Sequence, residues 1–127
     1  MFPNINLGTF YVNILFEVYN MNKKPKLLRD FLIYLTTITG KSDRTRKEYE
    51  YDLILFFRFL IAAQEEIEMN KVDLSIVTIE WIKEITLEDI YMFMEYCEKE
   101  RGNKAAARSR KAASIRAFFK YLKNKRN

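Results

Sequence analysis

SDRTRKEYEYDLILFFRFLIAA, residues 42–63, is the stretch of sequence that decides the fold. Residues 53–61 are apolar nearly all round, so this half of the stretch is expected to be buried on every side. Ser42 is a favourable N-cap residue. The stretch therefore predicts a long central helix from Ser42 to about Ala63. Its core positions recur at steps of three or four, the spacing of one helical face: Tyr49, Leu53, Phe56 and Leu60.

The same periodicity predicts further helices on both sides. They cover residues 25–39, 86–101 and 104–122, with a short helix at 79–83. Residues 64–77 are acidic and aperiodic, which indicates a loop. With three glycines and two prolines, the sequence predicts an all-α domain of four main helices and one short helix. The expected core faces of the flanking helices are Leu28, Phe31, Leu32 and Leu35, then Leu87, Ile90, Met94 and Cys97, then Ile115, Phe118, Phe119 and Leu122.

The net charge of +5 is unevenly distributed along the chain. Residues 101–127 hold ten Lys or Arg and no acidic residue, whereas residues 61–100 hold eleven acidic residues and three cations. A cationic surface confined to a few segments is typical of proteins that bind a polyanion. A chain of 127 residues fits one domain.

The composition excludes several kinds of site. The chain has no histidine and a single cysteine, Cys97, so neither histidine-based catalysis nor an internal disulfide is available. No metal, no other cofactor and no catalytic residue is predicted. No apolar run reaches 18 residues, so no membrane span is expected, and a reducing, cytoplasmic location is the default. Residues 1–22 form an apolar N-terminal extension without helical periodicity, which we expect to be disordered or peripheral to the fold; the alternative is a β-prone arm, TFYVNILF, that pairs with a partner.

Two groups of residues are candidates for contact with phosphate. On the central helix, Arg44 and Lys47 lie opposite the core, and Ser42 and Thr45 stand at the helix N-terminus, where free amides favour anions. The last helix begins with NKAAARSRKAAS, residues 103–114, in which small residues alternate with cations and allow close approach to DNA. Either group is also compatible with an ordinary solvated helix face. In the last helix, Arg110 is expected to point away from the core, whereas Arg108 and Lys111 lie along the extension of the core stripe.

Together, these helices resemble the N-terminal core-binding (SAM-like, lambda-integrase-like) domain of tyrosine recombinases, the phage integrase and Xer-type family. The pattern S-x-x-T-x-x-x-Y-x-x-D-L-x-x-F-x-x-F-L of its second helix is matched by Ser42, Thr45, Tyr49, Asp52, Leu53, Phe56, Phe59 and Leu60. The start of its third helix is matched by Ile85, Thr86, Asp89 and Ile90. Its last helix is matched by Arg110, Ile115, Arg116, Phe118, Phe119 and Leu122, with departures at Ala107, Arg108 and Ala112.

The resemblance implies a function. It implies a non-catalytic DNA-binding domain over residues 23–124, with residues 125–127 starting a linker to an absent catalytic domain. That second domain would carry the family's catalytic arginines, lysine and nucleophilic tyrosine. The implied partners are double-stranded DNA and other recombinase protomers, and the isolated domain is expected to be a monomer. The predicted DNA contacts are Ser42, Arg44, Thr45, Lys47, Lys104, Arg108, Arg110 and Lys111.

A second hypothesis comes from another class of protein. The segregated acidic and basic segments also fit a helical protein–protein interaction module, in which oppositely charged faces pair between copies or with a partner. Self-association that depends on salt, without affinity for DNA, would distinguish this module from a DNA-binding domain.

Overall fold

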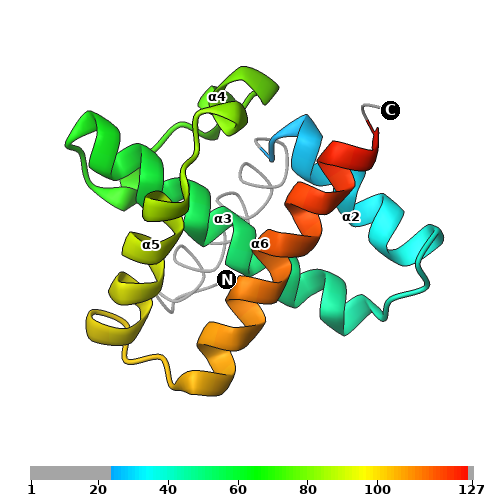
Figure 1. Ribbon diagram of the computed structural model, residues 1–127. Coiled ribbons are helices and arrows are strands. Elements are labelled where there is room, and N and C mark those ends of the chain that lie inside the picture. Colours follow the sequence, from blue (N-terminus) through cyan, green and yellow to red (C-terminus); the bar gives the residue numbers. More distant parts are fainter. Residues whose placement is uncertain (1–23, 126–127) are drawn as a thin grey trace, which may run out of the picture.

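The computed structural model describes residues 24–125, and within that range it contains helices and no strand (Figure 1). The all-α class is therefore confirmed. The predicted extension at residues 1–22 lies outside the described residues, as do residues 126 and 127 of the predicted linker, whereas its first residue, Lys125, is the last residue of α6. The α-helices are α2 (Lys26–Thr37), α3 (Asp43–Glu65), α4 (Ile79–Lys83), α5 (Leu87–Lys99) and α6 (Ala105–Lys125), and two 3₁₀ turns are η1 (Met69–Lys71) and η2 (Leu74–Ile76).

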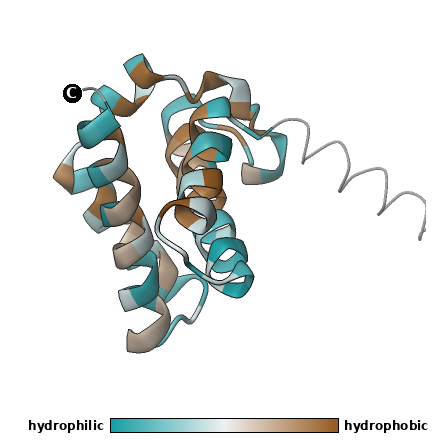
Figure 2. Cartoon of the chain, turned by 90° about the vertical axis from the view of Figure 1, so that its right-hand side faces the viewer, coloured by the Kyte–Doolittle hydropathy of each residue, from teal (hydrophilic) through white to brown (hydrophobic). Residues whose placement is uncertain are grey.

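Helix α3 is the centre of the fold, as its sequence predicts. Helices α2, α5 and α6 and the turn η1 all pack against it, and α6 also packs against α5. In Figure 1, α6 crosses in front of α3, with α5 on one side and α2 on the other. Figure 2 shows apolar stretches where the helices meet and hydrophilic turns towards the outside. The buried residues of α3 are Asp52, Leu53, Leu55, Phe56, Phe57, Leu60, Ile61 and Ala62.

The predicted helix starts are confirmed by their hydrogen bonds. The Ser42 hydroxyl accepts a hydrogen bond from the backbone N–H of Thr45 at 3.1 Å. At the start of α5, the Thr86 hydroxyl accepts from the Asp89 N–H at 3.2 Å, and the Asp89 carboxylate accepts from the Thr86 N–H at 2.9 Å. This is a complete capping box. Both caps satisfy amides that the first turn of a helix would leave without partners.

The segment between α3 and α4 is more ordered than its aperiodic sequence predicts. It contains η1 and η2, and it buries Leu74 and Val77 in the core. The Trp81 indole N–H donates to the Gln64 side-chain oxygen at 3.0 Å, which joins α4 to the end of α3. Single buried residues separated by short turns leave no periodic signal, which explains the difference. The short helix α4 lies where it was predicted, at residues 79–83.

Two predicted core faces are partly wrong. In α5 the buried residues are Phe93 and Cys97, whereas Leu87, expected in the core, is 60% exposed in the first turn. In α6 the centre of the core face is Phe118, which is fully buried against the rings of Phe31 and Phe57. Phe119 is only partly buried and turns towards α4. Adjacent residues point about 100° apart, so periodicity places a face only to within about one residue.

Candidate nucleic-acid interface

The N-terminus of α3 carries polar groups that bind one another. The Ser42 hydroxyl lies 3.1 Å from the Thr45 hydroxyl, in addition to capping the Thr45 amide. The Asp43 carboxylate pairs with Arg46 at 2.7 Å and with Lys47 at 3.4 Å. The hydrogen bond from Arg46 is the main reason that the pKa of Asp43 is lowered. Ser42 and Thr45 therefore stand together where the sequence predicts, beside a carboxylate that reduces the positive potential of this helix end.

Arg44 and Lys47 extend from α3 into solvent. Their side chains are 88% and 70% exposed. Arg44 Nε lies 3.9 Å from the Glu48 carboxylate, and Lys47 Nζ lies 3.4 Å from that of Asp43. Exposed pairs of this kind contribute at most about 1 kcal/mol each. Both cations can therefore leave their carboxylates for another anion at little cost.

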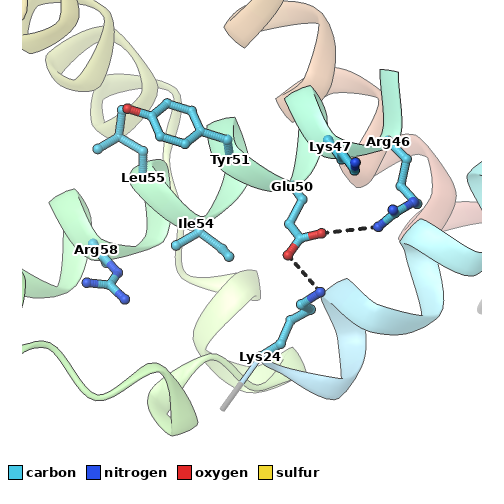
Figure 3. A pocket seen from close by; sticks show the side chains of 8 residues that line it. All are labelled: Lys24, Arg46, Lys47, Glu50, Tyr51, Ile54, Leu55 and Arg58. Atoms are coloured by element: carbon cyan, nitrogen blue, oxygen red, sulfur yellow. Dashed lines mark hydrogen bonds and ion pairs between the residues drawn. The ribbon is translucent and has the colours of Figure 1, made fainter. Parts of the chain in front are cut away.

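A groove of about 590 Å³ runs along the face of α3 that carries Lys47 (Figure 3). Glu50 lies within it and pairs with Lys24 at 2.7 Å and with Arg46 at 3.4 Å. The groove is therefore only partly cationic. Arg44 does not contribute to its lining, which is formed by Lys24, Arg46, Lys47, Glu50, Tyr51, Ile54, Leu55 and Arg58.

Asp52 and Arg110 form the strongest polar contact between α3 and α6. Asp52 is 0% exposed, and it accepts hydrogen bonds from Arg110 Nε at 2.9 Å and from Arg110 Nη2 at 2.8 Å. This two-point contact fixes the plane of the guanidinium, and it raises the pKa of Arg110. The prediction that Arg110 points away from the core is therefore wrong for most of the side chain. Its remaining nitrogen, Nη1, faces the Glu48 carboxylate at 3.7 Å.

Lys111 is buried as well. Its side chain is 3% exposed, and its ammonium lies 3.7 Å from the same Asp52 carboxylate. Lys111 lies along the extension of the core stripe, as predicted, and it contacts the core. In this structure the Lys111 ammonium helps Arg110 to balance the charge of Asp52, and its side chain offers no surface to a ligand. Buried charges are tolerated when they are paired in this way.

The start of α6 is held by the preceding turn. Arg108 Nη1 donates to the Asn103 carbonyl at 2.7 Å and lies 3.7 Å from the Glu98 carboxylate. Lys104 is exposed just before the first turn. Within residues 24–125, no carboxylate lies at ion-pair distance from Lys104. The same holds for three further exposed lysines and arginines of α6, namely Arg116, Lys120 and Lys123.

Two neighbouring residues of α3, Glu48 and Tyr51, each contact arginine side chains on the same surface of the domain. Glu48 approaches both Arg44 and Arg110. One turn along α3, the Tyr51 hydroxyl accepts a hydrogen bond from Arg101, whose guanidinium carbon lies 6.0 Å from the Tyr51 ring centre. We call this set the arginine surface; it comprises Arg44, Glu48, Tyr51, Arg101 and Arg110.

Sequence reasoning found part of the arginine surface and missed the rest. Arg44 and Arg110 were predicted contacts, whereas Glu48 and Arg101 were not singled out. Asp52 could have been recognised as a buried ion-pair partner, because it lies three residues after Tyr49 and four before Phe56, on an otherwise apolar face. Nothing in the sequence indicates that Arg101 reaches α3.

The described residues show neither a metal-binding cluster nor a membrane-spanning helix. No group of three or more Cys, Asp or Glu side chains between Lys24 and Lys125 is arranged to hold a metal ion. Over the same range no helix is long and apolar enough to cross a membrane. Cys97 is fully buried, as predicted, and burial raises the pKa of its thiol.

Comparison with known proteins identifies relatives. A tyrosine recombinase XerC from Caldanaerobacter subterraneus subsp. tengcongensis is 41% identical over 107 residues, covering 81% of this chain and 30% of that protein. A XerD from Listeria monocytogenes is 33% identical over 76% of this chain and 28% of its own length. A XerC from Chlorobaculum tepidum is 32% identical over 75% of this chain and 26% of its own.

The extent of these matches is limited. The chain spans less than a third of the length of the curated relatives that it matches. No model of a protein family matches it, and no solved structure gives a significant match. The homologues of this chain are therefore Xer-type tyrosine recombinases, as its sequence motifs indicate.

Proposed function

We propose that this chain is a DNA-binding domain of a site-specific tyrosine recombinase, and that it holds duplex DNA while the cleavage chemistry is supplied by sequence outside it. The observation that carries the proposal is the arginine surface, where arginines come from three segments: Arg44 and Arg110 lie beside Glu48, and Arg101 lies beside Tyr51 one turn along α3. Guanidinium groups bind phosphate oxygens with good geometry. The homology to recombinases supports DNA as the polyanion.

The roles within this surface follow from exposure. Arg44 and Arg101 are exposed and are proposed to contact phosphates directly. Arg110 is held by Asp52 and presents one nitrogen outward. Lys47, Ser42 and Thr45 at the start of α3, and Lys104 just before α6, are proposed as further DNA contacts. Arg108 and Lys111 are proposed to position α6 rather than to bind DNA, because the carbonyl of Asn103 and the carboxylate of Asp52 already engage them.

The test is a salt titration of duplex binding. Fluorescence anisotropy with a labelled duplex of about 30 base pairs should show a log–log salt slope of roughly −4 to −5, which corresponds to about four to six phosphates neutralised. Arg44→Ala should weaken binding to all sequences and reduce the magnitude of the slope by about 1. Lys71→Ala is the matched control, because Lys71 is an exposed cation at η1, beyond the far end of α3. Binding that does not respond to salt, or equal losses in the two variants, would contradict the proposal.

One observation favours the alternative of a protein–protein module. The outer face of α5 exposes Leu87, Tyr91 and Met92 by 60%, 61% and 52%, among several glutamates. Contiguous exposed apolar side chains are typical of contact surfaces. In the complete recombinase, this face is proposed to contact another protomer, whereas the domain alone is proposed to be a monomer. Sedimentation of the DNA-free protein, run beside the titration, measures self-association directly.

A further inference from the structure

The Glu48 carboxylate occupies an unusual position within the arginine surface. A single oxygen, Oε2, lies 3.9 Å from Arg44 Nε and 3.7 Å from Arg110 Nη1. Both distances are longer than those of normal hydrogen bonds. Glu48 therefore interacts with two guanidinium groups through charge alone. Its side chain is 36% exposed, so it can rotate away from them into solvent.

The neighbouring carboxylate binds Arg110 in a different way. Asp52 uses both of its oxygens, at 2.8 and 2.9 Å, and occupies Nη2 and Nε of the guanidinium. Nη1 is left as the nitrogen that faces Glu48. Because Asp52 is fully buried, the guanidinium is held in one orientation before any ligand arrives. Such preorganisation reduces the entropy lost when an anion binds.

We infer that the point between Arg44 and Arg110, now taken by the Glu48 carboxylate, is a phosphate-binding position, and that Glu48 competes with DNA for it. The inference rests on the proposed DNA-binding function. A phosphodiester carries the same single negative charge as the carboxylate, and its oxygens can accept from both arginines. In the free domain, Glu48 stands in for the phosphate. On binding, its side chain rotates away, and its charge opposes the backbone that replaces it. Glu48 thereby lowers affinity at this position and shortens the lifetime of the contact.

The test compares two variants that lose the same charge. Glu48→Gln should tighten binding to duplex DNA roughly three- to tenfold at about 0.1 M salt, because a competing carboxylate is removed from beside the phosphate. The control is Glu95→Gln on α5, where Glu95 pairs with Lys99 at 3.7 Å beside Phe59. Phe59 lies about 22 Å further along α3 than Arg44. Glu95→Gln should change affinity by less than about twofold under the same screening.

A third variant separates a local site from a general charge effect. In an Arg44→Ala background, Glu48→Gln should give little gain, because one side of the phosphate position is gone. Melting temperatures report whether each protein folds. Glu48→Ala removes the same charge by a second substitution, and should also tighten binding. Equal affinities for the Glu48 and Glu95 variants, or weaker binding after Glu48→Gln, would overturn the inference and leave the proposed function standing. No binding by any variant or by the native chain would overturn both.

Discussion

The two halves of α6 are attached to the rest of the domain by opposite means. Residues 115–125 use an apolar face, in which Ile115, Phe118 and Leu122 are buried in the core. Residues 105–114 are rich in alanine and bury Lys111 and Ser114, and Arg110 bonds Asp52 on α3. One helix is thus held at one end by hydrophobic packing and at the other by charge.

The difference has consequences for stability and for orientation. Apolar burial contributes free energy in proportion to area and depends little on direction. A buried ion pair is directional, but the cost of removing its charges from water offsets much of its attraction. The apolar half therefore supplies more of the folding free energy. The charged half determines how the start of α6 lies against α3, and so where Arg110 presents its free nitrogen.

The largest expected effect is in the apolar half. Phe118→Ala should reduce the free energy of unfolding by about 3–5 kcal/mol, because it removes a fully buried ring that contacts Phe31 and Phe57. Phe119→Ala is the matched control on the next residue and should cost clearly less, since that ring is only partly buried. Urea unfolding followed by circular dichroism measures both. Equal losses would mean that the face of α6 is rotated from the one described.

A smaller effect is expected in the charged half. Lys111→Met keeps most of the buried stem and removes the ammonium that lies 3.7 Å from Asp52. Arg110 still donates two hydrogen bonds to that carboxylate, so the loss should be only about 1 kcal/mol. The same unfolding experiment measures it. A loss as large as that of Phe118→Ala would show that Lys111 is the main partner of Asp52.

The comparison also explains how much of the molecule could be predicted from sequence. Amphipathic periodicity predicted the central helix, α4 and the apolar half of α6, because repeated burial of large side chains leaves a regular pattern in the sequence. It could not predict the ordered structure of the segment between α3 and α4, where Leu74 and Val77 are buried as single residues without a repeating pattern. Face assignments erred at Phe119, which is only partly buried, and at Leu87 in the first turn of α5.

The candidate site was harder to predict for a physical reason. A cation on a helix can face solvent or pair with a buried acid, and its own sequence neighbours do not distinguish the two. Arg110 and Lys111 were both predicted to contact DNA, yet both turn to Asp52, 58 and 59 positions earlier in the chain. Arg44, which has only a neighbouring carboxylate on its own helix, is exposed as predicted.

The central claim is that the ion pair between Asp52 and Arg110 holds the start of α6 against α3. A double-mutant cycle at these two residues tests it most directly. The free energy of unfolding is measured for the native chain, Asp52→Asn, Arg110→Met and the double variant. Arg110→Met alone should cost about 3 kcal/mol, because it leaves a buried carboxylate with one distant partner. The two changes should show a coupling energy of about 1.5–3 kcal/mol, as expected for a hydrogen-bonded charge pair. Additive losses, together with a negligible effect of Arg110→Met, would contradict the account and place Arg110 on the outer face of α6.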